Sequence, residues 1–373
     1  MTAPVPAAQA AAAPIKVMIV DDSAVVRGMV ARWLEAEAGI VVEVMAVDGV
    51  HALKKLAEHE VDICLLDIEM PVMSGLEALP QMLALRPGLR VIMASTLSER
   101  GAEVTLRALQ LGAADFIAKP SANRLGGADA YRRDLVDKIR QLGRRARSAG
   151  APASARAATA PRPSPVRAAA TSPLGARHPR PEALVIAAST GGPPALRRLF
   201  DQLGGDWRTP ILIAQHMPAE FTRTLARLID QVTPFEAREA VAGEAVKPGV
   251  IYVAPGAYHL TVRRGATGQV VTALDQEPPI NWCRPSADPL LASAAEVWGA
   301  GAVGLVLTGM GHDGRDGAAV LAAKGGRIIA QDEASSVVWG MPGAVVEAGL
   351  AERVLALDDI APFLAGLARG AIA

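Results

Sequence analysis

The chain has 373 residues, enough for two or three domains, and 51% of them are hydrophobic, which excludes a mainly disordered protein. Its 38 basic and 38 acidic residues cancel, so no overall charge favours binding to nucleic acid. The two cysteines, Cys64 and Cys283, lie in different halves of the chain, which is typical of a reducing compartment. No apolar run is long enough to span a membrane and no signal peptide is visible, so we expect a cytoplasmic protein without membrane insertion.

The first part of the chain alternates apolar strand patterns with helical patterns. The five expected strands are Lys16–Val20, Val41–Val47, Val61–Leu66, Arg90–Ser95 and Asp115–Ala118. The helices that should follow them are Ala24–Glu37, Gly49–Glu58, Leu76–Leu85, Glu103–Leu111 and Ala130–Arg145. Five such pairs predict a doubly wound α/β domain with a parallel sheet over residues 15–142.

Polar side chains follow the strands of this domain where the strands end. Asp21 and Asp22 come after the first strand, and Asp67 comes after the third. Since the carboxyl ends of parallel strands share one edge, three carboxylates should form an oxygen-rich site suited to Mg²⁺. One carboxylate there can attack a phosphoryl donor, with Lys119 pairing with the new charge and Ser95 bonding a phosphate oxygen. Each residue alone also fits a helix cap or a loop acid, but the matching positions together favour phosphorylation.

Low-complexity segments flank this domain. We expect residues 1–14 to be a disordered tail and residues 143–181 to be a linker, because a mixture of Ala, Pro, Ser and Arg cannot bury a core. The basic linker could suit nucleic acid, yet it has no aromatic residue for stacking between residues 148 and 180. A DNA-binding output is also disfavoured because the last part of the chain has no basic recognition helix.

Residues 182–373 show a second alternation of strands and helices. The expected strands are Ala183–Ala188, Ile211–Ala214, Val250–Ala254, Ala302–Leu307 and Arg327–Ala330. This pattern predicts another doubly wound, mainly parallel α/β domain.

Ser189, His216 and Asp313 each lie just beyond one of these apolar runs. A serine hydroxyl needs an imidazole within hydrogen-bond reach and an acid that orients this imidazole, so the three residues suit nucleophilic catalysis. His259 and His312 are alternative bases. The alternative is a purely structural role, in which Ser189 only caps a helix.

A glycine-flanked loop places the backbone N–H of Met310 where it could bind an oxyanion. This domain shows neither the ligand spacing of a zinc site nor a dinucleotide-binding glycine motif, so we expect it to need no cofactor.

The first domain resembles a two-component receiver domain over its full length. The resemblance implies that Asp67 is the phosphoacceptor and that Asp21, Asp22 and Asp67 bind Mg²⁺. It also implies a set of switch residues, which are Ser95, Phe116 and Lys119.

The second domain is similar to the chemotaxis methylesterase family. The ordered motifs that carry this likeness are AASTGG, AQHMP, VAPG, RPSAD, LTGMGHDG and WGMP. The resemblance implies Ser189 as nucleophile, His216 as general base and Asp313 as orienting acid. It further implies that Met310 supplies the oxyanion N–H and that Thr190 supports it.

Together the resemblances imply a phosphorylation-regulated hydrolase that removes methyl esters from glutamate side chains of chemoreceptors. Deamidation of glutamine belongs to some members, and the unphosphorylated receiver is expected to restrain the esterase. The implied partners are methyl-accepting chemotaxis receptors and a histidine kinase that donates phosphate, and we expect a monomer. The alternative is a non-catalytic, receiver-controlled module that binds a partner.

Overall fold

The computed structural model describes residues 13–119, 127–150, 179–204 and 207–370. The expected tail and most of the expected linker therefore lie outside the described residues. The described residues form two compact units: an N-terminal unit of residues 13–94 and 127–150, and a C-terminal unit that contains residues 95–119 and the described residues from 179 onward. The strands form two parallel sheets and one hairpin. No helix in the described ranges is long and apolar enough to cross a membrane.

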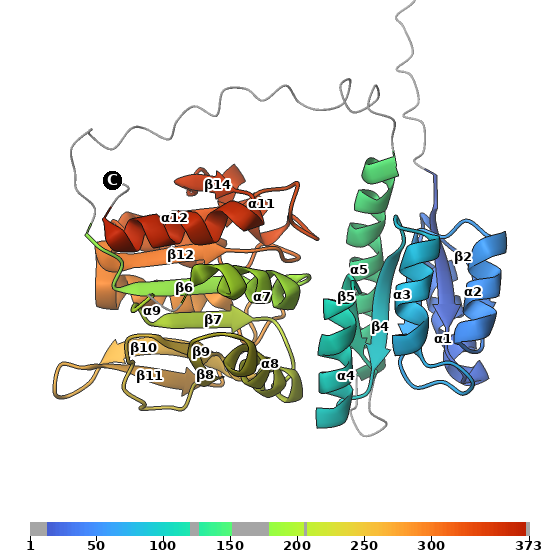
Figure 1. The fold of residues 1–373 in the computed structure, drawn as a ribbon, viewed down its shortest axis with the longest axis horizontal. Coiled ribbons are helices and arrows are strands. Elements are labelled where there is room, and N and C mark those ends of the chain that lie inside the picture. The colour runs from blue at the N-terminus through green and yellow to red at the C-terminus, as the bar shows by residue number, and fades with distance from the viewer. Residues whose placement is uncertain (1–12, 120–126, 151–178, 205–206, 371–373) are drawn as a thin grey trace, which may run out of the picture. The chain divides into compact units, whose positions relative to one another are not determined.

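The N-terminal sheet has five strands in the order β2-β1-β3-β4-β5 (Figure 1). Its strands are β1 (Ile15–Val20), β2 (Ile40–Ala46), β3 (Ile63–Asp67), β4 (Arg90–Ser95) and β5 (Asp115–Ala118). The helices that follow them are α1 (Ala24–Glu35), α2 (Gly49–Glu58), α3 (Gly75–Leu85), α4 (Glu99–Gln110) and α5 (Gly127–Gly150). The five expected strand–helix pairs are confirmed, although α5 runs on into the segment expected to be linker.

Capping side chains fix where the helices of this sheet begin. Ser23, Asp48, Ser74 and Ser98 each accept a hydrogen bond from a backbone N–H in the first turn of the next helix. Each helix therefore starts at a defined distance beyond the carboxyl end of a strand, which leaves the strand-end residues at one edge of the sheet.

The C-terminal sheet has seven parallel strands in the order β14-β13-β12-β6-β7-β9-β8. They are β6 (Ala183–Ala188), β7 (Ile211–Gln215), β8 (Glu236–Glu239), β9 (Val250–Val253), β12 (Ala302–Val306), β13 (Arg327–Gln331) and β14 (Arg353–Leu355). An antiparallel hairpin is formed by β10 (His259–Arg264) and β11 (Val270–Asp275). The helices are α7 (Gly192–Leu203), α8 (Ala219–Val232), α9 (Ala287–Trp298), α10 (Arg315–Ala323), α11 (Met341–Glu347) and α12 (Leu357–Arg369), with a short 3₁₀ turn at Gly299–Gly301.

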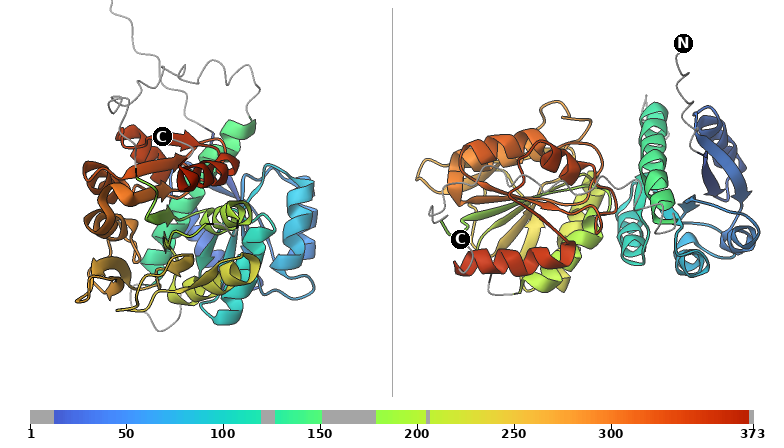
Figure 2. Two further views of the ribbon diagram at one scale, coloured as in Figure 1. Left: turned by 60° about the vertical axis from the view of Figure 1, so that its left-hand side comes forward. Right: turned by 90° about the horizontal axis from the view of Figure 1, so that it is seen from above.

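Strand β6 is the centre of this unit. All six of its residues are buried, as expected for a strand covered by helices on both faces. Figure 2 shows helices on both sides of the sheet: α12 packs beside α7, and α9 packs beside α10. The strand order runs outward from β6 in both directions, with β7 on one side and β12 on the other. The carboxyl end of β6 is therefore the topological switch point, where α/β sheets bind their ligands.

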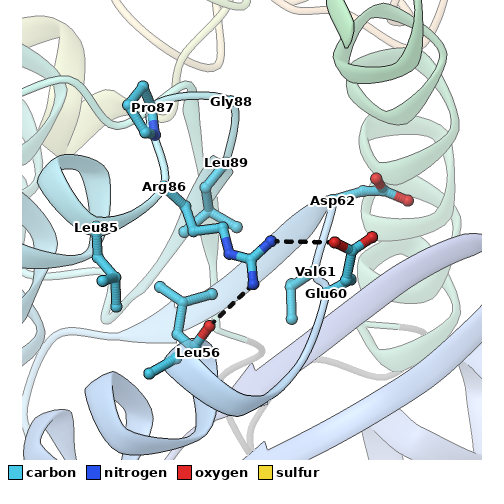
Figure 3. Close-up of a pocket in the computed structure, with 10 residues that line it drawn as sticks. Leu56, Glu60, Val61, Asp62, Leu85, Arg86, Pro87, Gly88 and Leu89 are labelled. Atoms are coloured by element: carbon cyan, nitrogen blue, oxygen red, sulfur yellow. Dashed lines mark hydrogen bonds and ion pairs between the residues drawn. The ribbon is translucent and has the colours of Figure 1, made fainter.

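A surface hollow of about 540 Å³ lies in the N-terminal unit at the amino ends of β3 and β4 (Figure 3). Arg86 crosses it, donating a hydrogen bond to the carbonyl oxygen of His59 (2.9 Å) and forming an ion pair with Glu60 (3.7 Å). The guanidinium thus provides a hydrogen-bond donor for a carbonyl group at the C-terminal end of α2. Because the hollow opens at the opposite end of β3 from Asp67, it is a packing feature and not the predicted site.

The tight packing of β12 gives a test of this core. A Cβ on Gly304 would lie 2.9 Å from Ile328 Cδ1 and 3.1 Å from side-chain carbons of Leu291 and Leu321. We expect Gly304→Ala to lower the free energy of unfolding of the C-terminal unit by about 1–3 kcal/mol, because the added methyl overpacks the core. Urea titration followed by tryptophan fluorescence measures this loss. Gly28→Ala in α1, where a Cβ meets nothing within 4 Å, is the control and should not destabilise the protein; equal midpoints for both variants would contradict the packing.

Candidate active site

Ser189 lies in the turn between β6 and α7, and glycines make this turn possible. Gly191 has a φ of 76°, a left-handed conformation that favours glycine. A Cβ on Gly192 would lie only 2.0 Å from the side-chain oxygen of Gln215. The Ser189 N–H donates to the carbonyl oxygen of Thr308 (3.1 Å), which ties the turn to the segment after β12. The serine is therefore held at the switch point, between the ends of its two neighbouring strands.

His216 and Asp313 meet at the same edge. The backbone N–H of His216 donates to the carbonyl oxygen of Ala188, and its ring Nε2 lies 2.7 Å from Asp313 Oδ2. Asp313 follows β12 and is 1% exposed. The structure thus brings together the two residues predicted as base and orienting acid, although they are 97 positions apart in the chain.

Asp313 receives two further hydrogen bonds that the sequence did not predict. The Ser286 hydroxyl donates to Oδ1 (2.5 Å), and the Ala287 N–H at the start of α9 donates to Oδ2 (2.7 Å). Burial by itself raises the pKa of Asp313, but the hydrogen bond and charge of His216, with these two donors, hold the pKa below its usual range. Asp313 is therefore ionised, and its carboxylate accepts a hydrogen bond from the N–H at Nε2 of His216.

The pKa of the His216 imidazole is shifted in the opposite direction, upward. Burial lowers its pKa, whereas the charge and hydrogen bonds of Cys283 and Asp313 raise it, and the net result is a pKa of about 10. The Cys283 Sγ lies 3.3 Å from Nδ1, so both ring nitrogens have partners. In the ranges that the structure describes, no hydrogen bond joins the Ser189 hydroxyl to this ring.

The loop after β12 passes directly beside the serine. A Cβ on Gly309 would lie 2.9 Å from Ser189 Cβ, so only a glycine lets the loop come this close. The next residue, Met310, has a backbone N–H that donates to no group among the described residues. Thr190 follows Ser189 in the turn itself. A backbone N–H without an acceptor is the kind of donor that an oxyanion requires.

The two alternative bases occupy other positions. His259 is buried, its Nδ1 accepts from the Ser286 N–H (3.1 Å), and its Nε2 lies 3.3 Å from the carbonyl oxygen of Pro278. Both of its nitrogens are thus engaged with the loop that carries Cys283. His312 is exposed. Among these histidines, His216 is the one paired with the buried carboxylate.

In the N-terminal unit the three predicted carboxylates converge. Oxygens of Asp21, Asp22 and Asp67 lie within 4.8 Å of one another, with Asp21 and Asp67 buried and Asp22 exposed. The Ser23 N–H donates to Asp21 Oδ1 (2.9 Å) and helps to orient it. Three hard oxygen donors with one side open to water fit Mg²⁺, which keeps several of its waters when bound to protein.

The predicted switch residues lie at the ends of β4 and β5. The Ser95 hydroxyl bonds to the Thr105 hydroxyl (2.7 Å) and to the carbonyl oxygen of Gly101 (3.3 Å), both in α4. The Lys119 N–H donates to the carbonyl oxygen of Ser95 (2.7 Å). Phe116 belongs to β5. Ser95 is therefore directed toward α4 in this conformation.

Comparison with known proteins gives matches over both units. A family model described as CheB methylesterase matches residues 184–364, and one described as response regulator receiver domain matches residues 17–126. Protein-glutamate methylesterase/protein-glutamine glutaminase 2 of Caulobacter vibrioides is 64% identical over 355 residues, which cover 95% of this chain and 99% of that protein. A protein-glutamate methylesterase/protein-glutamine glutaminase of Maricaulis maris is 46% identical over 99% of this chain and 100% of its own length. The crystal structure of the Thermotoga maritima CheB methylesterase catalytic domain is 40% identical, with 50% of this chain and 98% of that one covered and a TM-score of 0.49.

Replacing the buried carboxylate tests the electrostatics of the pair. In Asp313→Asn we expect the pKa of His216 to fall below about 10, because the charge and the hydrogen bond of Asp313 no longer oppose the effect of burial. A folded-state pKa above the unfolded value of about 6.5 stabilises the protein fully below pH 6.5 and loses this effect as the pH rises toward 10. This alkaline loss of stability should be smaller in the variant. Imidazole NMR titration and unfolding at several pH values measure both effects; His312→Gln is the control, and an unmoved His216 titration in Asp313→Asn would refute the pairing.

Proposed function

Because this chain belongs to the CheB methylesterase family and carries a receiver domain, we propose that it hydrolyses methyl esters of glutamate side chains in chemoreceptors. The same site would convert glutamine side chains to glutamate. The observation that carries the proposal is the buried Asp313–His216 pair at the switch point, next to a serine held in a glycine turn. We infer that the enzyme acts in the cytoplasm, where the methylated receptor segments would lie.

The geometry supports a division of roles among the catalytic residues. Nε2 of His216 is bonded to Asp313, so Nδ1 is the nitrogen left to take the proton of Ser189 as its oxygen attacks the ester carbonyl. The oxyanion would bind the Met310 N–H, with Thr190 supporting the turn. The C–O bond then breaks, His216 returns the proton to departing methanol, and water hydrolyses the acyl-enzyme. With a glutamine substrate, the leaving group is ammonia.

The receiver supplies the control. We propose that Asp67 takes a phosphoryl group from a histidine kinase and that Asp21, Asp22 and Asp67 hold the Mg²⁺. When bound, the cation neutralises charge on the transferring phosphoryl group. The phosphorylated carboxylate gains negative charge, and the Ser95 hydroxyl is the nearby donor that would leave α4 to bond it. A shift of Ser95 would carry the signal into α4.

Removal of the nucleophile separates an enzyme from a binding module. Ser189→Ala should abolish methanol release from methylated receptor, to less than about one thousandth of wild type, because the attacking oxygen is removed. Binding to the receptor should persist in a pull-down with receptor-containing membranes. Methanol release by Ser189→Ala at the wild-type rate would rule out this serine as the nucleophile.

Metal removal tests the receiver. A small-molecule phosphodonor with Mg²⁺ should raise the rate of methanol release by wild type, because phosphorylation relieves the restraint on the esterase. With EDTA, or in Asp67→Asn, the ratio of rates with and without phosphodonor should fall to one. Glu69→Gln, an exposed carboxylate two residues further on, is the matched control and should keep the response. A response that survives in Asp67→Asn would place the phosphorylation elsewhere.

A further inference from the structure

We propose that Cys283 is a positioning residue for the esterase reaction: its thiol holds Nδ1 of His216, the nitrogen that must take the proton of Ser189. This inference rests on the proposed function. It makes the loop that carries Cys283 the element that determines whether the base is available to the nucleophile.

The contacts of the imidazole leave no room for a third partner. Nε2 is bonded to Asp313 at 2.7 Å, and Nδ1 lies 3.3 Å from Cys283 Sγ. A carboxylate can only accept, so Nε2 carries a proton and Nδ1 offers one hydrogen-bonding position. That position cannot serve the Cys283 sulfur and the Ser189 hydroxyl at full strength together. The thiol and the nucleophile therefore compete for one atom.

The thiol is placed by a loop anchored at both ends. His259 bonds the carbonyl oxygen of Pro278 at the start of the loop and the N–H of Ser286 at its end. Within the loop, Ile280 and Cys283 exchange two backbone hydrogen bonds of 3.1 and 2.8 Å. These four contacts fix Cys283 against the ring, as expected for a side chain with a defined role.

The tip of the same loop is strained and open to solvent. Asn281 and Trp282 have φ values of 51° and 65°, which side-chain-bearing residues rarely adopt. Trp282 is 89% exposed, so a substrate helix that approaches the site can press on its indole. Relaxation of this strained turn would withdraw the adjoining thiol from His216. Substrate contact at the tip and release of the base are thereby coupled through two neighbouring residues.

The charges around the ring fix the direction of the effect. The titratable groups bonded to His216 are Asp313 and Cys283, and Asp288 lies next to Asp313 with its pKa raised to about 6, mainly by burial. Cys283 adds to the rise in the pKa of His216 both by its charge and by its hydrogen bond, whereas burial opposes it. Without the thiol, the imidazole loses its proton at lower pH and Nδ1 is free to accept from Ser189.

The test is methanol release by full-length protein as a function of pH. In Cys283→Ala the rising limb of kcat/KM should move about one unit to lower pH, which gives roughly tenfold higher kcat/KM at pH 7 with KM unchanged. Cys283→Ser should move the limb in the same direction with a smaller gain, because the hydroxyl can still form a hydrogen bond with Nδ1. Cys64→Ala removes the other thiol, which is buried in β3. The rising limb of its kcat/KM profile should lie at the same pH as that of wild type.

Two results would overturn the proposal. One is a limb that stays in place in both Cys283 variants while circular dichroism shows a native fold. The other is a loss of activity at every pH without displacement, which would leave Cys283 only a structural part of the loop. NMR titration of His216 in Cys283→Ala distinguishes this from failure of the esterase function itself: a lowered pKa supports the thiol contact even if wild type releases no methanol.

Discussion

The buried carboxylate of Asp313 is the group on which the geometry of the candidate active site depends. A negative charge almost completely withdrawn from water costs several kcal/mol unless it is hydrogen-bonded and paired. Here three donors converge on it: the His216 ring, the Ser286 hydroxyl and the Ala287 N–H. Two of these donors are neighbours at the start of α9, and the third comes from the residue after β7. The need to satisfy this one charge therefore orients the His216 ring, fixes the start of α9 and anchors the loop that precedes it.

The parts of the fold that follow from local patterns could be predicted. Strand β6 is a continuous apolar run, and Ser189 is the first polar residue beyond it, so their positions are visible in the sequence. The parallel arrangement then implies that polar residues after neighbouring strands share an edge. By contrast, β8 reads Glu-Ala-Arg-Glu and has no strand signal of its own. It is extended because it pairs with β9, and its polar side chains suit an edge strand.

The parts of the site that depend on contacts between distant segments could not be predicted. Nothing near Cys283 in the sequence indicates that its sulfur meets a ring 67 positions away. His259 was a reasonable alternative base until the structure showed both of its nitrogens engaged with a neighbouring loop. The strand order could not be predicted either, because β6 pairs with β12, which comes much later in the chain. Spacing along the sequence carries no information on such pairings.

The central position of β6 has a consequence for how the protein is made. Its partner β12 leaves the ribosome long after the serine turn, and Asp313 comes later still. Strand pairings between residues far apart in the sequence form slowly, because a long loop must close before the stabilising contacts can form. A growing or truncated chain that ends before β12 therefore contains the serine and the histidine but no acid to orient them. The candidate active site is therefore completed late in folding, when most of the chain is already in place.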